Sequence, residues 1–318
     1  MDEPRLLPHT PFLILDGPTG TELIRKGYQP SEHLWTAKAS LDRPDLLLEV
    51  HQNYLRAGAQ ILTANTFRAN SYSSKKAGLT VLETRKLVHS SVALATEAVE
   101  AFESEEALFV AGSIGPLEDC YRPELVPPLK VLEEVHRQTA QWLVEAGCDL
   151  VLIETMGTLR EARAALDAAQ KARAKSVLVS FIVDETGSHL LGGEPLVGAA
   201  QECVSHGAGA VLVNCVHSSV IEKALRALQA ITAQGVVLGA YANASKMTIA
   251  GSKQIKWRPD GLTVEQQAAE YAQSALEWMR SYHSLILGGC CGMTPEHIRA
   301  LSQILRGSAS APQGRGPK

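Results

Sequence analysis

The stretch Leu285-Ile286-Leu287-Gly288-Gly289-Cys290-Cys291-Gly292 joins a short apolar run to two adjacent cysteines. The apolar part is typical of a buried strand, so the cysteines are expected where that strand ends and a loop begins. The same arrangement occurs upstream, where Ala210-Val211-Leu212-Val213 leads into Asn214-Cys215. Two buried strands that both end in cysteine predict a sheet that delivers three thiols to one of its edges.

Strand-like and helix-like segments alternate along the chain. The predicted strands are Phe12–Leu15, Ile61–Ala64, Leu108–Ala111, Leu150–Ile153, Val177–Phe181, Ala210–Val213, Val236–Gly239 and Leu285–Leu287. The predicted helices are Asp45–Ala57, Val81–Phe102, Leu129–Ala146, Leu159–Ala172, Leu196–Ser205, Val220–Thr232 and Val264–Tyr282, with a last one that begins at Thr294-Pro295-Glu296. Eight such units predict an α/β fold, a single (β/α)8 TIM barrel, with an open doubly wound sheet as the alternative.

The composition allows one large domain. The chain has 318 residues, of which 45% are hydrophobic, which is enough to bury a sizeable core. We expect the barrel domain to occupy residues 1–306. The segment 307–318 is rich in Gly, Ser, Pro and Ala and is expected to be a disordered tail.

Charge and cysteine usage restrict the partners and the compartment. A net charge of -4 favours neither nucleic acid nor an anionic membrane as a partner. The start of the chain does not resemble a signal peptide, and no apolar run approaches the about 18 residues that a membrane helix needs. Six cysteines are too few for a disulfide scaffold in so long a chain. We therefore expect a cytoplasmic protein that acts on small molecules, as a monomer or a small homo-oligomer.

Cys215, Cys290 and Cys291 are candidate metal ligands. Three thiolates fill three corners of a zinc tetrahedron and leave the fourth open, as in catalytic zinc sites. Neighbouring residues of a regular strand point to opposite faces, so the backbone should turn at the doublet, with the surrounding glycines supplying the permissive dihedral angles. The alternatives are a strained disulfide between the neighbours, or inert buried thiols. Cys148 and Cys203 are interpreted as packing residues, and Cys120 has no assigned role.

Polar residues follow several of the other predicted strands. Asp16 follows the first strand, Thr66 the second, Glu154 the fourth and Asn243 the seventh. Active sites of this barrel lie at the carboxyl ends of its strands, and carboxylates beside a metal site are suited to hold a cationic group of a ligand. A carboxylate in such a position can equally cap a helix. These four residues are the candidates for substrate binding.

Together these motifs resemble the homocysteine S-methyltransferase family over nearly the whole chain. The resemblance is carried, in order, by Asp16-Gly17, Thr63-Ala64-Asn65-Thr66-Phe67, Gly112-Ser113-Ile114-Gly115-Pro116, Ile153-Glu154-Thr155, Val213-Asn214-Cys215 and Gly289-Cys290-Cys291-Gly292. It implies a barrel, Zn²⁺ on the three cysteines, and homocysteine as the methyl acceptor that becomes methionine. It also implies that Asp16 and Glu154 hold the amino acid end of homocysteine.

The methyl donor is indicated by a shorter resemblance. The segment from His33 to Lys38 is similar to that of members that use S-methylmethionine, which implies S-methylmethionine or S-adenosylmethionine as the donor. We expect neither the folate and cobalamin modules of methionine synthase nor the extension of the betaine enzyme. Aromatic side chains expected in loops on the active face are candidates to contact a cationic methyl donor, with loop packing as the alternative: Trp35, Phe67, Tyr72 and Tyr121.

Other functions stay open at this point. One is a methyltransferase of the same fold that uses a betaine-like donor or another thiol or selenol acceptor. Another is a zinc hydrolase or lyase, and a third is a protein with structural zinc. The last two depend on His217, two residues after Cys215, joining the metal site rather than starting a helix. The loop Leu117–Pro128 has no assigned role.

Overall fold

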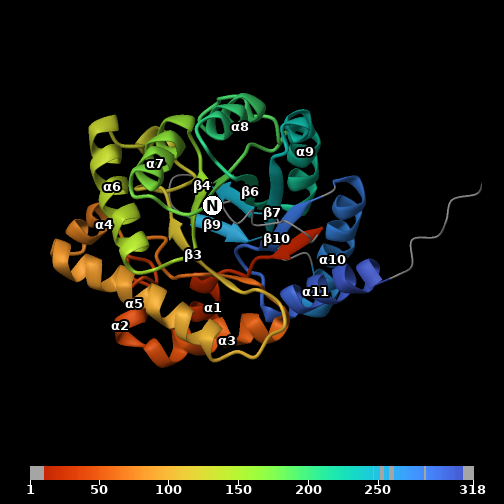
Figure 1. Ribbon diagram of the computed structural model, residues 1–318, viewed down its shortest axis with the longest axis horizontal. Helices are drawn as coiled ribbons and strands as arrows, with labels where there is room; N and C mark the ends of the chain where they lie inside the picture. The colour runs from red at the N-terminus through yellow and green to blue at the C-terminus, as the bar shows by residue number, and fades with distance from the viewer. Residues whose placement is uncertain (1–10, 246, 251–253, 258–260, 283, 311–318) are drawn as a thin grey trace, which may run out of the picture.

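The computed structural model describes residues 11–245, 247–250, 254–257, 261–282 and 284–310. Eight strands in this part of the chain form one parallel sheet in the order β1-β10-β7-β6-β5-β4-β3-β2. An isolated parallel bridge between Leu15 and Ile61 joins the two ends of that sheet, which makes it a nearly closed barrel. Helices surround the strands (Figure 1). The predicted (β/α)8 barrel is confirmed, and the open-sheet alternative is wrong.

The bounds of the elements follow the predicted alternation. The barrel strands are β1 (Phe12–Ile14), β2 (Ile61–Thr63), β3 (Phe109–Ile114), β4 (Leu150–Met156), β5 (Val177–Phe181), β6 (Ala210–His217), β7 (Val237–Asn243) and β10 (Leu285–Gly289). The helices are α1 (Thr19–Arg25), α2 (Ala39–Asp42), α3 (Pro44–Ala57), α4 (Ser71–Lys76), α5 (Val81–Glu100), α6 (Leu129–Glu145), α7 (Leu159–Lys171), α8 (Leu196–Ser205), α9 (Ser218–Leu228), α10 (Val264–Ser281) and α11 (Pro295–Ser310), with short 3-10 turns η1 (Pro123–Leu125) and η2 (Gln229–Gln234). An antiparallel hairpin of β8 (Met247–Ala250) and β9 (Gln254–Trp257), which we did not predict, lies between β7 and α10.

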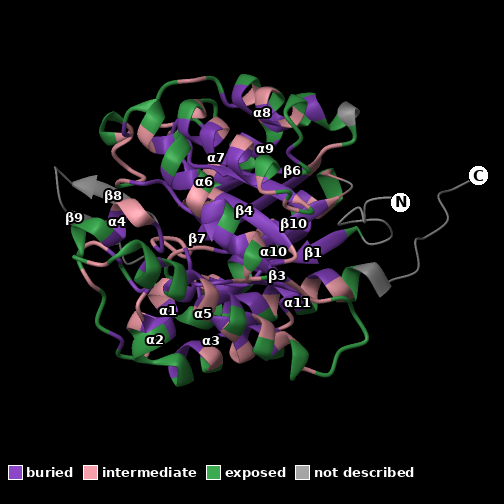
Figure 2. Cartoon of the chain, turned by 60° about the vertical axis from the view of Figure 1, so that its left-hand side comes forward, coloured by how far each residue is buried: buried purple, intermediate pink, exposed green. Residues whose placement is uncertain are grey.

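The strands are almost continuously apolar because both of their faces are buried. In β4, Leu150 and Leu152 belong to the cluster inside the barrel, whereas Val151 and Ile153 pack in the layer shared with the helices. The helices bury one face on the barrel and expose the other (Figure 2). None of the helices in the described ranges is both long and apolar enough to span a membrane.

Local signals in the sequence explain where several helices begin and end. Pro44 occupies the first turn of α3, and Gly58, with φ 102°, ends that helix. Thr80 and Glu83 form a capping box at the start of α5. Helix α11 continues to Ser310 and so includes residues 307–310, which we expected to belong to the tail. The remainder of the proposed tail, and residues 1–10 of the proposed domain, lie outside the described residues.

Three strands continue through residues that we expected to follow them. Glu154, Cys215 and Asn243 lie within β4, β6 and β7. Strands β4 and β6 shift register near their ends, where Thr155 and Cys215 adopt left-handed backbone angles with φ of 63° and 60°. A bulge of this kind re-aims a side chain without ending the strand, so these candidate site residues are presented from strands rather than from loops.

Candidate metal and substrate site

Three cysteine sulfurs meet at the carboxyl ends of the barrel strands. Cys215 comes from the bulge in β6, and Cys290 and Cys291 directly follow β10. Their Sγ atoms all lie within 4.8 Å of one another, and those of Cys215 and Cys291 are 4.0 Å apart. Tetrahedral zinc with bonds of about 2.3 Å holds its sulfur ligands about 3.8 Å apart, so the cluster fits this metal. All six cysteines are free, so the disulfide alternative is wrong.

The glycines beside the doublet serve the site in two different ways. Gly292 has φ 81°, as expected for a residue that turns the backbone. Gly288 and Gly289 instead lie within β10 and are not among the residues with positive φ, so our expectation for these two was wrong. A Cβ atom on Gly288 would approach the backbone oxygen of Asp16 to 2.9 Å. Gly288 is therefore required for the close packing of β10 against the chain that leaves β1.

The cysteine cluster concentrates negative charge on Cys215. The thiols of Cys290 and Cys291 share hydrogen bonds with the Cys215 sulfur, which lowers the pKa of Cys215 to about 6 although it is buried. The same interactions raise the pKa of Cys290 and of Cys291. The hydroxyl of Tyr121 also lies 2.9 Å from the Cys215 sulfur. A partly buried group of sulfurs that favours an anionic member is suited to bind a cation.

Glu154 lies between two hydroxyl groups near the cysteines. Ser113 Oγ donates to one of its carboxylate oxygens, and Tyr241 OH donates to the other at 3.1 Å. Burial raises the pKa of Glu154 to about 7, and the nearby Cys290 contributes to that rise. Thr66 contacts Ser113 rather than Glu154 itself: its hydroxyl accepts a hydrogen bond from Ser113 N at 3.0 Å and donates one to Ser113 O at 2.8 Å. Thr66 therefore fixes the residue that holds Glu154.

Asp16 is a second buried acid in the same region. Its carboxylate accepts hydrogen bonds from Thr63 N at 2.7 Å and from Thr63 Oγ1 at 2.8 Å, which ties the end of β1 to β2. Burial raises the pKa of Asp16 to about 7, and the charge of Glu154 raises it further. Neither Asp16 nor Glu154 forms an ion pair with a basic side chain in the described part of the chain. Two adjacent buried acids without a basic partner favour the binding of a cationic group.

Asn243, at the end of β7, has a buried amide that lacks protein partners. The residue is 2% exposed, and neither Nδ2 nor Oδ1 has a hydrogen-bond partner among the residues that the structure describes. Buried amides are nearly always hydrogen-bonded, so an unsatisfied one at the barrel mouth points to a ligand group that completes its bonding.

The remaining residues singled out in the sequence lie elsewhere. His217 caps α9, where its side chain accepts a hydrogen bond from Ser219 N, and it is not part of the sulfur cluster. Cys148 and Cys203 are buried in the core, as we expected of packing residues. Cys120 lies in the loop after β3, and burial raises the pKa of its thiol to about 12.

The four candidate aromatic residues differ in what they contact. The indole of Trp35, which is 41% exposed, covers Gly20, and the ring of Phe67 covers Gly115. Tyr72 OH donates to Glu118 at 2.6 Å. Tyr121 alone among these four residues is hydrogen-bonded to a sulfur of the cluster. The contacts of Ser113 and Tyr241 with Glu154 were not predicted from the sequence. The available signal was that both residues lie near the ends of predicted strands.

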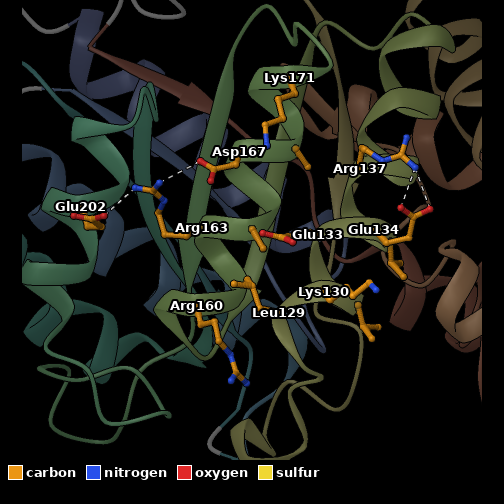
Figure 3. Close-up of a pocket in the computed structure, with 14 residues that line it drawn as sticks. Leu129, Lys130, Glu133, Glu134, Arg137, Arg160, Arg163, Asp167, Lys171 and Glu202 are labelled. Atoms are coloured by element: carbon orange, nitrogen blue, oxygen red, sulfur yellow. Dashed lines mark hydrogen bonds and ion pairs between the residues drawn. The ribbon is translucent and has the colours of Figure 1, made fainter.

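A groove of about 960 Å³ lies between α6 and α7, and none of the cysteines lines it (Figure 3). Its charged side chains largely neutralise one another. Arg163 pairs with Asp167 at 3.2 Å and with Glu202 at 2.9 Å, and Arg137 pairs with Glu134 at 3.0 Å. The groove is therefore an ordinary solvated surface between helices and has none of the chemistry of the barrel mouth.

The fold and the site define a barrel enzyme with a three-thiol centre and two buried acids at its mouth. A family model described as homocysteine S-methyltransferase matches residues 13–305. The chain therefore belongs to the homocysteine S-methyltransferase family, and it is a methyltransferase.

Individual relatives agree with this assignment. The chain is 33% identical over 314 residues to the homocysteine S-methyltransferase of Escherichia coli strain K12, a match that covers 93% of this chain and 96% of the relative. It is 30% identical over 310 residues to homocysteine S-methyltransferase YbgG of Bacillus subtilis strain 168, covering 93% and 95%. The crystal structure of the E. coli homocysteine methyltransferase MmuM in its metallated form superposes with a TM-score of 0.78 at 28% identity, covering 94% of this chain and 98% of that one.

Proposed function

We propose that this protein transfers a methyl group from S-methylmethionine, or from S-adenosylmethionine, to the thiol of homocysteine and so forms methionine, with Zn²⁺ on Cys215, Cys290 and Cys291. The cluster of three sulfurs is the observation that carries this proposal, because it leaves one corner of a zinc tetrahedron for a substrate sulfur. A free thiol has a pKa of about 8.5, and zinc, when bound, would keep the substrate sulfur in its nucleophilic thiolate form at neutral pH.

The two buried acids are proposed to hold the amino acid end of homocysteine. Glu154 pairs with the ammonium group, and Asp16 adds negative charge beside it. Thr66 contributes through Ser113, which keeps the Glu154 carboxylate in place. The unpartnered amide of Asn243 binds a polar group of the substrate. Held in this way, the substrate has its sulfur directed towards the cysteines, and such positioning supplies much of the rate of a two-substrate reaction.

The methyl transfer itself follows from the charges of the reactants. The substrate sulfur attacks the methyl carbon, a new S–C bond forms, and the bond from carbon to the donor sulfonium breaks. The donor leaves as a neutral thioether that keeps the bonding electron pair. Opposite charges cancel along this path, so a site from which water is excluded favours it. The burial of Asp16 and Cys215 and the partial burial of Glu154 support this feature.

The structure gives no support to a hydrolase or to a structural-zinc protein. Both alternatives needed His217 at the metal site, whereas His217 caps α9. A sulfonium donor is supported by the aromatic side chain of Tyr121 beside the Cys215 sulfur, since aromatic faces attract cations.

A comparison of two cysteine variants tests the proposal. Cys290→Ala removes a proposed ligand, and Cys203→Ala removes a core thiol of the same size as a matched control. Metal analysis should find one zinc per chain in the wild type and in Cys203→Ala, and both should form methionine from homocysteine and S-methylmethionine. Cys290→Ala should lose the zinc and the activity while keeping the circular dichroism of the folded barrel. A Cys290→Ala protein that retains its zinc would contradict the proposal.

A further inference from the structure

The loop Leu117–Pro128 brings one hydroxyl group onto the sulfur cluster. Tyr121 OH lies 2.9 Å from the sulfur of Cys215, a residue 94 positions further along the chain. The loop is fixed close to Tyr121. Its first residue, Leu117, donates its backbone N–H to the buried Glu161 at 2.8 Å, and Tyr121 N donates to Asp119 Oδ1 at 3.0 Å. These two hydrogen bonds, one to α7 and one within the loop, help to hold the Tyr121 hydroxyl at this sulfur.

The direction of this hydrogen bond follows from the chemistry of the site. A cysteine that ligates a metal is a thiolate and has no proton to give, so the phenol is the donor. In the described part of the chain, the other two sulfurs have no equivalent hydroxyl contact. Asn214 Nδ2 lies 3.9 Å from the sulfur of Cys290, and the sulfur of Cys291 lies 4.0 Å from that of Cys215. Within the described residues, Cys215 is thus distinguished by a short hydroxyl bond.

This difference matters because the proposed reaction must choose among sulfurs. Once homocysteine joins Cys215, Cys290 and Cys291, the site contains four sulfur nucleophiles beside one electrophilic methyl group. Transfer to a cysteine would form an S–CH₃ bond there, release the donor as its thioether, and leave S-methylcysteine in place of a ligand. A hydrogen bond to a thiolate draws electron density from the sulfur and lowers its nucleophilicity.

We propose that Tyr121 is a specificity-determining residue that suppresses methylation of Cys215 and so directs the methyl group to homocysteine. This inference rests on the proposed function, since it assumes a thiolate at Cys215 and an electrophilic methyl donor. The proposal gives a role to the loop Leu117–Pro128, for which the sequence analysis assigned none. The hydroxyl group of Tyr121 is responsible for the suppression, so a phenylalanine that keeps the aromatic ring should lose it.

The experiment measures the reactivity of each cysteine in zinc-loaded protein. Wild type and Tyr121→Phe are treated with methyl iodide, which transfers a methyl group to a thiolate and releases iodide, and the rate at each cysteine is followed by peptide mass spectrometry. The control is Tyr28→Phe, which removes a tyrosine hydroxyl that bonds Asp42 at 3.3 Å away from the cluster. Zinc is quantified in every sample.

The expected result is a selective change at one sulfur. Methylation of Cys215 should accelerate by about tenfold or more in Tyr121→Phe, the rate equivalent of one lost hydrogen bond to a charged group, while Cys290 and Cys291 change little. Tyr28→Phe should match the wild type. Equal Cys215 rates in wild type and Tyr121→Phe, with zinc retained, would overturn the inference and leave the proposed function intact. Loss of zinc from Tyr121→Phe alone would assign the hydroxyl to metal retention and also overturn it, whereas a wild type that binds no zinc refutes the proposed function itself.

Discussion

Two hydrogen bonds join Asn214 to Thr155 across strand β5, which lies between their own strands in the barrel. The Asn214 side chain, in β6, donates to Thr155 Oγ1 at 2.8 Å and accepts from Thr155 N at 3.1 Å in β4. Ser180, in the intervening β5, donates to the same Asn214 oxygen at 2.7 Å. The residues next to this pair are Cys215 and Glu154, so one buried amide fixes the bulges that present a candidate metal ligand and a candidate substrate-binding residue.

Replacing Asn214 by alanine should therefore weaken both the fold and the metal site. The change leaves Thr155 N without its partner, and a buried unsatisfied donor costs about 1–3 kcal/mol of unfolding free energy. Zinc affinity should fall by about tenfold to a hundredfold, as when the support of a metal ligand is removed. Denaturant unfolding and a zinc competition titration measure the two effects. Asn53→Ala, on the exposed side of α3, is the control and should change neither.

Glu154→Gln keeps the shape of the side chain and removes its charge. Loss of a charged pair with the substrate ammonium costs about 2–5 kcal/mol in a buried setting, so the affinity for homocysteine should fall by well over tenfold. Zinc content should stay at the wild-type level, because Glu154 is not part of the sulfur cluster. Isothermal titration with homocysteine checks the prediction, and an unchanged affinity would show that Glu154 has a structural role.

The same substitution tests the titration of Glu154 in reduced, metal-free protein. Burial raises its pKa from 4.5 to about 7 in the folded state, so the folded state binds the extra proton between these values. This group therefore stabilises the fold most below about pH 4.5, and its contribution is lost as the pH rises through about 7. Relative to Glu154→Gln, the wild type should lose up to about 3 kcal/mol of unfolding free energy across this range. A difference that is independent of pH would argue against the raised pKa.

Asn243→Leu separates a ligand-binding role from a structural one. The amide has no partner among the described residues, so an apolar side chain of similar size should leave the free energy of unfolding unchanged or raise it. Substrate binding should nevertheless weaken, because the ligand loses its contact with the amide. Unfolding curves and homocysteine titration are compared on the same samples. Lower stability together with normal substrate binding is the result that would rule out the proposed role.

A panel of methyl donors tests the identity of the second substrate. Zinc-loaded protein with homocysteine should form methionine fastest from S-methylmethionine and more slowly from S-adenosylmethionine. Betaine and methyltetrahydrofolate should give no turnover, because neither offers the sulfonium methyl group that the proposed reaction uses. Methionine is followed by chromatography. Turnover with betaine alone would reject the donor assignment and leave the thiolate chemistry of the cysteines untouched.

The sequence predicted the barrel because its strands carry a strong local signal. Runs such as Ala210–Val213 are buried on both faces, and the glycines and prolines that delimit helices act on their immediate neighbours. The hairpin formed by β8 and β9 was missed, since its residues lack the long apolar run of a barrel strand. The bulges at Thr155 and Cys215 were also missed, because residues other than glycine rarely adopt such backbone angles and only tertiary contacts impose them.

The sequence indicated the candidate residues of the site but not the contacts between them. The cysteines were identified because their residue type and their position at strand ends are both local features, and the structure brings the three sulfurs together. Asp16 and Glu154 were chosen as candidates in the same way, and their role in substrate binding stays a prediction. The contact of Tyr121 with Cys215 and the bond of Ser113 to Glu154 join residues far apart in the chain. No pattern in a single sequence reports such pairings, since they depend on how loops pack over the finished barrel.

The pairing of β1 with β10, which aligns Phe12 with Leu285, has a consequence for biosynthesis. The strands are synthesised in chain order, so β1 cannot pair with β10 until nearly the whole barrel has been translated. Cys215 emerges long before Cys290 and Cys291, and a nascent chain that ends between them carries one sulfur of the cluster. The complete set of three sulfurs thus exists only in chains whose last barrel strand has been made, so the candidate metal site is among the last parts of the barrel to be assembled.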